Sequence, residues 1–490
     1  MKKPSVFARS LILTLFILVI AIVPALAGST TKTLSTNYTV VNLGSVDASV
    51  TALYYKDTGA TWTADADKTN FTVGANYGQK VIAQYFDSTL ASGKGSVVLS
   101  STEPLAAVVQ IQARGQTAST GAYTGYTSGS NKFYIPLVLR QATTANGVAN
   151  TQIMIQNIMN ETITAGVEFI PNPATAFSSF TKPPFSIPPY STQYYDVADE
   201  LASNLPNGWI GSAVVTAQSG KQIAVVVNIF TGADGMQTLN AFPVESIGTS
   251  WAVPQFASRL TNSFNTPINV QNVSGGSIAI GDLDLDCVPA AGYVGTVSKS
   301  NTTAIPNNAT YGFNPVTDLT ILPNWQGACK VVASGNVVTF VQLRRPGVTS
   351  DFSAYEAFRS DSTNTKVVVP LVAKRLANGF ATAVTIQNLS STTTAHVTLT
   401  FTRAPGIVVG NATYSMNQTI APNANAIVNM RLPGEPTGLG MPDAWQGTLV
   451  VTTETGQTAV PTVAYVQLTN INILPGDNWM AHDAFSVPEP

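Results

Sequence analysis

The chain has 490 residues, of which 44% are apolar and 10% are charged, with 24 basic and 26 acidic side chains. The apolar fraction is high enough to bury cores, so a disordered polymer is excluded. A net charge of −2 leaves no basic field for nucleic acid or anionic lipid, and two Cys with two His argue against a structural zinc protein.

Residues 1–27 have the pattern of a secretory signal peptide. Three basic residues precede an apolar run over 11–23, and small residues at 25 and 27 mark a signal-peptidase site. The alternative is an uncleaved membrane anchor, but the apolar run is shorter than the roughly 20 residues of a spanning helix. We expect cleavage after residue 27, no later transmembrane segment, and a protein that is secreted or held on the extracellular surface.

The rest of the chain repeats four times. One marker is a residue pair ending in Asn, which is Gln-Asn in the last three copies, and the Asn residues lie 115 or 116 positions apart. A second marker is a Gly that opens a β-rich run and follows a Trp by two residues in three copies. The markers are Asn42, Asn157, Asn272 and Asn388, then Gly95, Gly211, Gly327 and Gly447, with Trp209, Trp325 and Trp445. They divide the mature chain into modules 28–128, 129–246, 247–362 and 363–490.

Each module is predicted to consist of short antiparallel strands. Residues 151–156 and 383–387 alternate apolar and polar side chains with period 2, and residues 48–54 and 395–401 do the same after a turn. Helical periodicity is nearly absent. About 115 residues of such strands suit one immunoglobulin-like β-sandwich. The predicted fold class is therefore all-β, with four tandem immunoglobulin-like β-sandwich modules after a signal peptide.

A family resemblance is carried by residues 42–54 and 388–401. Both segments place Asn, a small turn, Ala and an alternating apolar run in one order. In this they resemble bacterial extracellular Ig-like modules of the cell-adhesion-related, CARDB-like kind. The patterns Pro-Leu-Val-x-x-Arg, Gln-Asn and Trp-x-Gly-x-x-Val also resemble repeat modules of exported bacterial surface proteins. The resemblance implies a fold and a compartment, but no activity.

One repeated feature occurs only three times. A Pro-containing strand followed by Arg occurs around Pro136, Pro254 and Pro370 and has no fourth copy. Either module 1 lacks its first strand or module 4 lacks its last, so a terminal module exposes an unpaired sheet edge. The edge is filled within the chain by residues 28–36 or 485–487, or else another molecule adds a strand and joins molecules head to tail.

Module 2 contains the richest aromatic patch, formed by Tyr190, Tyr194 and Tyr195 beside two prolines. Aromatic faces can stack on sugar rings, so these tyrosines are the candidates for contact with a glycan or a protein. The repeated Trp residues occupy one fixed module position instead, which predicts packing at a corner of each sandwich.

Module 3 contains both cysteines and an acidic strand. Cys287 and Cys329 are expected to point inward, which predicts an inter-sheet disulfide in an oxidising compartment, with two buried free thiols as the alternative. Asp282, Asp284 and Asp286 share the opposite strand face. They are only weak calcium candidates, because side chains two apart on a strand are too far apart for all three to hold one ion. The alternative is a solvated edge strand.

The sequence shows no arrangement for catalysis. His482-Asp483 is the only His–acid neighbour pair, no nucleophile elbow occurs, and no carboxylate pair for glycoside hydrolysis is apparent. We therefore predict a non-catalytic exported surface protein without cofactors: a structural spacer, adhesin or envelope component. The alternative is a secreted carbohydrate-binding protein that uses aromatic patches. Expected partners are cell-envelope components, glycans or other copies of the chain, and not nucleic acid.

Overall fold

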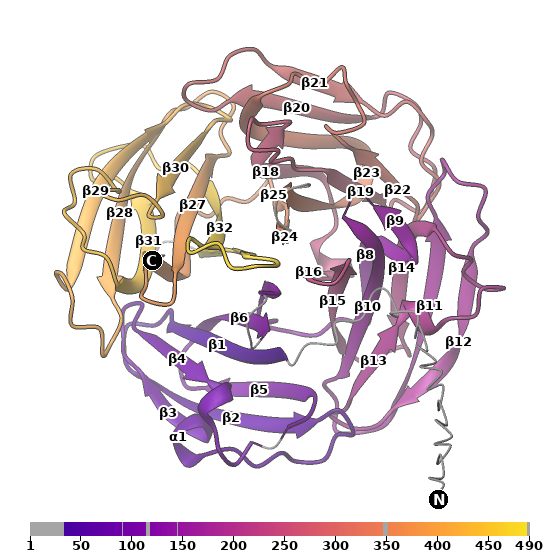
Figure 1. Cartoon of the computed structure of the whole chain (residues 1–490), viewed down its shortest axis with the longest axis horizontal. Coiled ribbons are helices and arrows are strands. Elements are labelled where there is room, and N and C mark those ends of the chain that lie inside the picture. The colour runs from indigo at the N-terminus through magenta and orange to yellow at the C-terminus, as the bar shows by residue number, and fades with distance from the viewer. Residues whose placement is uncertain (1–33, 91, 114–117, 145, 346–350, 488–490) are drawn as a thin grey trace, which may run out of the picture.

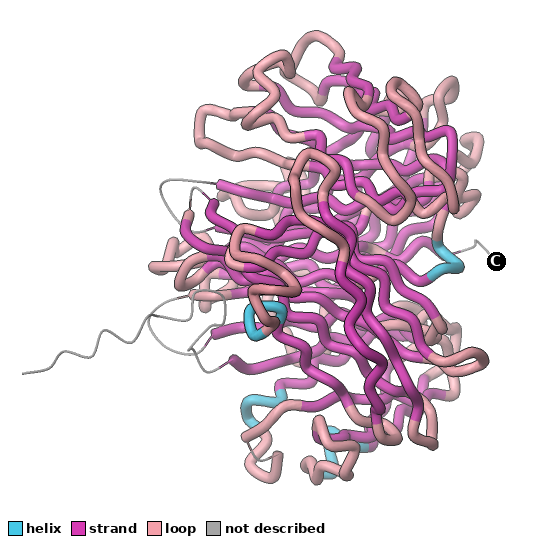
Figure 2. The backbone as a smooth tube through the Cα atoms, turned by 90° about the vertical axis from the view of Figure 1, so that its right-hand side faces the viewer, coloured by secondary structure: helices cyan, strands magenta, loops and turns pink. Residues whose placement is uncertain are grey.

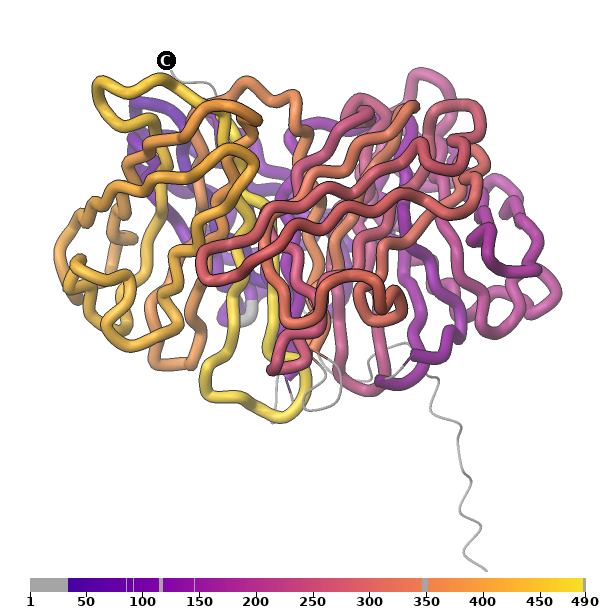
Figure 3. The backbone as a smooth tube through the Cα atoms, turned by 90° about the horizontal axis from the view of Figure 1, so that it is seen from above, coloured from indigo at the N-terminus to yellow at the C-terminus, as the bar shows by residue number. Residues whose placement is uncertain are grey.

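Four pairs of antiparallel sheet layers surround a common axis in a computed structural model of the chain (Figure 1). The structure describes residues 34–90, 92–113, 118–144, 146–345 and 351–487, so the predicted signal peptide lies outside it. We call the pairs units 1 to 4, and they comprise β1–β7, β8–β17, β18–β25 and β26–β34. The C-terminal unit, orange to yellow, lies next to the indigo N-terminal unit in Figure 1, and the two overlap when seen from above in Figure 3. β1 contacts β26, so the units close into a ring.

Unit 1 is the smallest of the four. Its inner layer, nearest the axis, has the strand order β4-β1-β6-β7, and its outer layer has the order β3-β2-β5. The elements are β1 (Leu34–Asn42), β2 (Ala48–Lys56), α1 (Ala66–Thr69), β3 (Asn70–Val73), β4 (Gln79–Ala83), the 3₁₀ turn η1 (Gln84–Phe86), β5 (Gly95–Ser101), β6 (Leu105–Ala113) and β7 (Thr120–Thr124).

Unit 2 adds two strands to the outer layer. The inner layer has the order β13-β10-β15-β16, with β9 paired to β10, and the outer layer has the order β12-β11-β14-β8-β17. The elements are β8 (Lys132–Arg140), β9 (Ala142–Thr144), β10 (Gly147–Asn157), β11 (Ile163–Pro171), β12 (Phe180–Ile187), β13 (Thr192–Asp196), η2 (Val197–Asp199), β14 (Trp209–Ala217), β15 (Ile223–Thr231), β16 (Gly235–Asn240), β17 (Phe242–Pro243) and η3 (Val244–Ser246).

Unit 3 follows the same plan, but one long strand serves both layers. β23 pairs with β20 and β18 in the outer layer and with β19 and β24 in the inner layer. The elements are β18 (Gly248–Ser258), β19 (Ile268–Asn272), β20 (Leu283–Pro289), β21 (Val297–Ser300), β22 (Thr310–Phe313), β23 (Trp325–Arg345), β24 (Asp351–Glu356) and β25 (Phe358–Arg359).

Unit 4 repeats the plan of unit 2. Its inner layer has the order β30-β27-β32-β33 and its outer layer the order β29-β28-β31-β26-β34. The elements are β26 (Lys366–Lys374), β27 (Phe380–Asn388), β28 (Ala395–Arg403), β29 (Thr413–Ile420), β30 (Asn425–Asn429), β31 (Trp445–Thr453), β32 (Thr462–Asn470), β33 (Trp479–Asp483) and β34 (Phe485–Val487). The all-β prediction is confirmed, and strands dominate the side view (Figure 2).

Alternation along the strands explains why the sandwiches form. In β2 every second side chain is buried from Ala48 to Tyr54, and β11 and β28 bury alternate side chains in the same way. Their apolar residues face the other layer, while Thr and other polar residues face away. The layers therefore bury one face each, and the cores lie between inner and outer sheets.

The Trp-x-Gly marker is a packing device in the outer layer. The rings of Trp209, Trp325 and Trp445 are at most 2% exposed. Each ring lies over the Gly two residues later, where a Cβ on Gly211 would stand 2.7 Å from the Trp209 ring and 2.0 Å from the Ile170 carbonyl oxygen. Only glycine leaves room there for both the ring and the neighbouring strand.

We expect Gly211→Ala to lower the free energy of unfolding by about 1–3 kcal/mol, because the added methyl group overpacks the site. Gly166→Ala, on the neighbouring strand β11, is the matched control, since a Cβ there meets nothing within 4 Å. Denaturant unfolding of both variants checks this, and equal effects of the two substitutions would contradict the packing role.

The outer layer of unit 1 ends at β5, where the other units continue with two more strands. β34 pairs with β26 in unit 4, as β17 pairs with β8 and β25 with β18. Unit 4 therefore has its last strand, and the missing strand belongs to unit 1. The prediction that residues 485–487 fill the gap is wrong, because they form β34 of unit 4. Of the other expected segment, 28–36, residues 34–36 belong to β1 in the inner layer.

Candidate functional site

The units are joined by side chains that bond to the backbone of the next outer layer. Gln271 Nε2 of unit 3 donates to the Ala213 carbonyl of unit 2 at 3.3 Å, and Gln387 Nε2 of unit 4 donates to the Cys329 carbonyl of unit 3 at 3.1 Å. Gln79 Nε2 of unit 1 donates to the Gly447 carbonyl of unit 4 at 3.1 Å. This last bond joins the first unit to the last and closes the ring.

Four strands, one from each unit, line the axis. β7 contacts β16 and β33, and β24 contacts the same two strands. They occupy equivalent places, because each is the strand that pairs with β6, β15, β23 or β32 at the end of an inner layer. The residues that come together here belong to all four repeats, so this centre is the one place where the whole ring can act as a unit.

Asp477 ties the strands together at one end of the axis. Its carboxylate accepts N–H bonds from Met236 at 2.8 Å, Phe352 at 3.0 Å and Trp479 at 3.1 Å, and its backbone carbonyl accepts the Thr120 hydroxyl at 3.3 Å. These contacts reach units 1, 2 and 3 from unit 4. Complete burial raises the pKa of Asp477 well above its usual value, while the three N–H bonds favour the charged form.

A carboxyl pair lies toward the other end of the same strands. The side chains of Glu356 and Asp483 hydrogen-bond to each other, and desolvation raises the pKa of both carboxyl groups, which favours a proton shared by the pair. Glu356 Oε1 also accepts the Asn240 N–H at 2.6 Å. Asn240 Nδ2 in turn donates to the Thr124 hydroxyl at 2.8 Å. One residue from each unit thus contributes to this polar layer.

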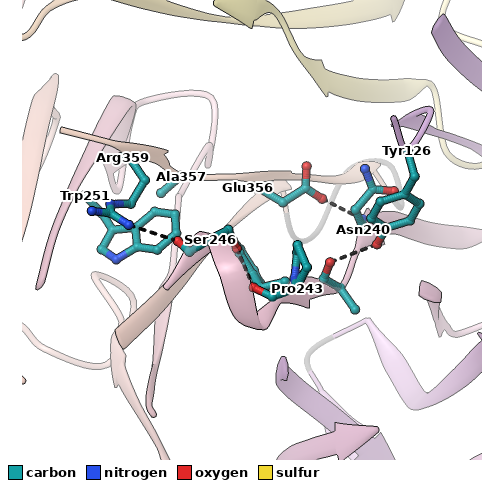
Figure 4. Close-up of a pocket in the computed structure, with 10 residues that line it drawn as sticks. Tyr126, Asn240, Pro243, Ser246, Trp251, Glu356, Ala357 and Arg359 are labelled. Atoms are coloured by element: carbon teal, nitrogen blue, oxygen red, sulfur yellow. Dashed lines mark hydrogen bonds between the residues drawn. The ribbon is translucent and has the colours of Figure 1, made fainter. Parts of the chain in front are cut away.

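The polar layer borders a small cavity of about 250 Å³ between units 2 and 3 (Figure 4). Glu356 and Asn240 line it together with Tyr126, Trp251 and Arg359. Tyr126 donates to the Ala241 carbonyl at 2.8 Å, and the Arg359 guanidinium donates to the Ile247 carbonyl. The volume falls below the roughly 300–1,000 Å³ of ordinary ligand sites. Most of its polar groups bond neighbouring strands, while Asn240 Oδ1 and Arg359 Nε are buried without a hydrogen bond. The carboxyl pair is therefore best suited to hold units 3 and 4 together in a proton-dependent way.

We expect Asp483→Asn to raise the free energy of unfolding by about 1–2 kcal/mol at pH 8 and to change it little at pH 4. A raised carboxyl pKa stabilises the fold at low pH, and this contribution is lost as pH rises from about 4 through the folded pKa. The amide side chain that replaces the acid in Asp483→Asn can still hydrogen-bond to Glu356, and the substitution removes the second ionisable group from the pair. Thermal unfolding at both pH values measures the effect.

Asp284→Asn is the control, because the Asp284 carboxylate bonds Ser300 at the surface. An equal change in the stability of Asp483→Asn at both pH values would contradict the shared proton.

No motif in the sequence pointed to this polar layer. Thr124, Asn240, Glu356 and Asp483 occupy equivalent register positions opposite Val108, Val226, Phe340 and Tyr465. When the four repeats are aligned position by position, these residues form one polar position at the end of an otherwise apolar strand, and this is the sequence signal for the layer. His482, considered only as a neighbour of Asp483, bonds the Asp483 backbone carbonyl at 3.0 Å, and burial lowers its pKa to about 4.

The three candidate tyrosines do not share one exposed face. Tyr190 stacks on Tyr55 of unit 1 with ring centroids 4.8 Å apart, and Tyr194 donates to the Gly95 carbonyl of unit 1 at 3.3 Å. Tyr195 is 8% exposed and bonds Glu200 within unit 2. Two of the rings therefore pack at the junction of units 1 and 2, and the third packs inside a sandwich.

Cys287 and Cys329 are joined by a disulfide bond and are both buried. The predicted inter-sheet arrangement is wrong, because the two residues lie directly opposite each other on β20 and β23, which are neighbours in one outer layer. The bond crosses between strands rather than between layers. The prediction placed both side chains inward but had no means of deciding which strands are adjacent.

Asp282, Asp284 and Asp286 do not converge. The Asp284 and Asp286 carboxylates accept hydroxyl bonds from Ser300 and Ser298 of β21, and Asp282 lies exposed before the strand. Across the described residues, no group of three or more His, Cys, Asp or Glu side chains is placed to hold a metal ion. The edge-strand alternative is also wrong, since β20 lies between β21 and β23.

No protein-family model and no curated protein significantly matches this chain. In the part of the chain that the structure describes, no helix has the length and apolar character to cross a membrane.

Proposed function

We propose that the chain is an exported, non-catalytic envelope protein in which four immunoglobulin-like sandwiches form one rigid ring. The signal-peptide pattern of residues 1–27 supports export. The acidic side chains at the centre support the non-catalytic role, because Asp477 and Glu356 accept hydrogen bonds from backbone N–H groups of neighbouring units. The hydrogen bonds of these two acids hold the units together.

Ring closure is the observation that carries the proposal. In an extended spacer the modules lie in a line, which maximises its length. Here Gln79 bonds the Gly447 and Pro370 carbonyls of unit 4, so the first module lies next to the last. A closed ring keeps its loops in fixed relative positions. Among the predicted roles, this geometry favours an envelope component that presents a fixed surface over an extended spacer.

The partners that suit this role are cell-envelope components, glycans or other copies of the chain. The alternative of carbohydrate binding through the tyrosine patch gains no support, because Tyr190 and Tyr194 are engaged with unit 1 and Tyr195 packs inside unit 2. We therefore propose the envelope role alone.

Fractionation of the producing cells tests the proposal. We expect the protein outside the cytoplasmic membrane, with an N-terminus near Gly28 and a radius of gyration of about 23 Å, the value for one compact body of this length. A variant that lacks residues 2–27 should remain in the cytoplasm. Recovery of the uncleaved chain from the cytoplasm would contradict export, and a radius about twice as large would contradict the rigid ring.

A further inference from the structure

The β5 edge of unit 1 is the largest departure from the repeated plan. In units 2, 3 and 4 the equivalent strands β14, β23 and β31 each pair with a Pro-containing strand, β8, β18 or β26. Among the described residues, β5 pairs only with β2. We call the unfilled position beside β5 the acceptor slot.

The Pro-containing strand has a second role, because its Pro carbonyl accepts a bond from the next unit. The donor is always the first residue of the fourth inner strand: Thr310 Oγ1 to Pro136 at 2.7 Å, Asn425 Nδ2 to Pro254 at 2.5 Å and Gln79 Nε2 to Pro370 at 2.5 Å. A register shift interrupts the ladder at each Pro, which has no N–H to donate. The carbonyl is thereby free for the neighbour.

Thr192 is the fourth member of this series, and its hydroxyl has no partner, although its backbone N–H donates to the Asp57 carbonyl of unit 1 at 3.0 Å. It opens β13 and lies opposite Gln156, as Thr310 lies opposite Gln271 and Asn425 opposite Gln387. The residue is 8% exposed, and its Oγ1 atom is buried without a hydrogen bond. The acceptor that its three counterparts use would come from the strand that unit 1 lacks. A buried hydroxyl without a hydrogen bond destabilises the fold until an acceptor is supplied.

The apolar side of the slot is also incomplete. None of the seven residues of β5 is buried, whereas β14 and β31 bury most of theirs. Val97 and Leu99 are only partly buried, but their counterparts Ala213 and Val215 are fully buried. One more strand over β5 would cover these side chains and supply the missing ladder.

In the part of the chain that the structure describes, no strand is left over to fill the slot. The C-terminal strand β34 is already paired with β26, and β1 begins at Leu34 in the inner layer. Cleavage after residue 27 leaves six residues before β1, whereas β8 and β26 have nine residues each and a connection before the next strand. The donor must therefore come from another polypeptide.

We propose that the acceptor slot takes an extended segment of about nine residues from a second exported polypeptide. The three strands that fill this position define its chemistry: apolar side chains on both faces, a Pro near the middle and, in β8 and β26, a basic residue at each end. The Pro carbonyl accepts the Thr192 hydroxyl, and the backbone pairs with β5. The proposal rests on the proposed function in one respect, the removal of the leader.

A peptide with the sequence of β8, Lys132–Arg140, is the probe, and the mature protein 28–490 is the acceptor. We expect saturable binding of one peptide per protein, a higher melting temperature, and slower amide hydrogen exchange over residues 95–101. Thr192→Val should weaken binding about tenfold through loss of one buried hydrogen bond. Thr310→Val is the matched control and should leave the affinity unchanged, because β8 already occupies its site within the chain.

Two results would overturn the proposal. The first is absence of binding, or binding that neither protects residues 95–101 nor depends on Thr192. The second is binding to 28–490 but not to the folded chain 1–490, which would make the chain's own leader the occupant in place of a second polypeptide. Export of a mature protein that fails to bind would reject the slot while leaving the envelope role intact.

Discussion

A buried asparagine holds the two layers of every unit together. Asn157 Nδ2 donates to the Glu161 carbonyl of the following turn at 2.8 Å and to the Ile187 carbonyl of the outer layer at 3.0 Å, and its Oδ1 accepts the Met159 N–H at 2.8 Å. The equivalent Asn42, Asn272 and Asn388 make the same three kinds of bond. All four are fully buried. Because buried polar groups must be satisfied, this side chain fixes the turn and the distance between the layers at once.

The residue before that Asn joins neighbouring units. Consecutive side chains of a strand point to opposite faces, so when Asn272 turns into its own sandwich, Gln271 turns outward to the Ala213 carbonyl of unit 2. The repeated pair Gln-Asn therefore encodes both the module and its junction. Unit 1 has Val41 in this place, which packs on Val368 and Val450 of unit 4, and there Gln79 makes the polar bonds.

The centre of the ring combines strong packing with costly electrostatics. Gly121 and Gly235 allow close approach, because a Cβ on either would stand 2.3 Å or 2.5 Å from a side chain of the neighbouring unit. Asp477 at one end of the axis is buried and Glu356 at the other is partly buried, and both acids are retained although desolvation disfavours their charge. Such groups specify one arrangement of the units, since Asp477 accepts N–H bonds from units 2 and 3 and Glu356 accepts one from unit 2.

The sequence by itself determined the strand content, the period of the repeat and the absence of one strand from a terminal module. These are local or periodic properties: alternation needs only neighbours in the chain, and a missing Pro-containing segment is visible by counting. Trp209 and its counterparts were likewise assigned to packing from their fixed position. The tertiary structure alone decided that the modules close into a ring, that Cys287 and Cys329 lie on adjacent strands, and that Glu356 meets Asp483. Each of these depends on which strands become neighbours in space. The repeat period along the chain contains no information about the angle between successive modules, so it could not predict these contacts.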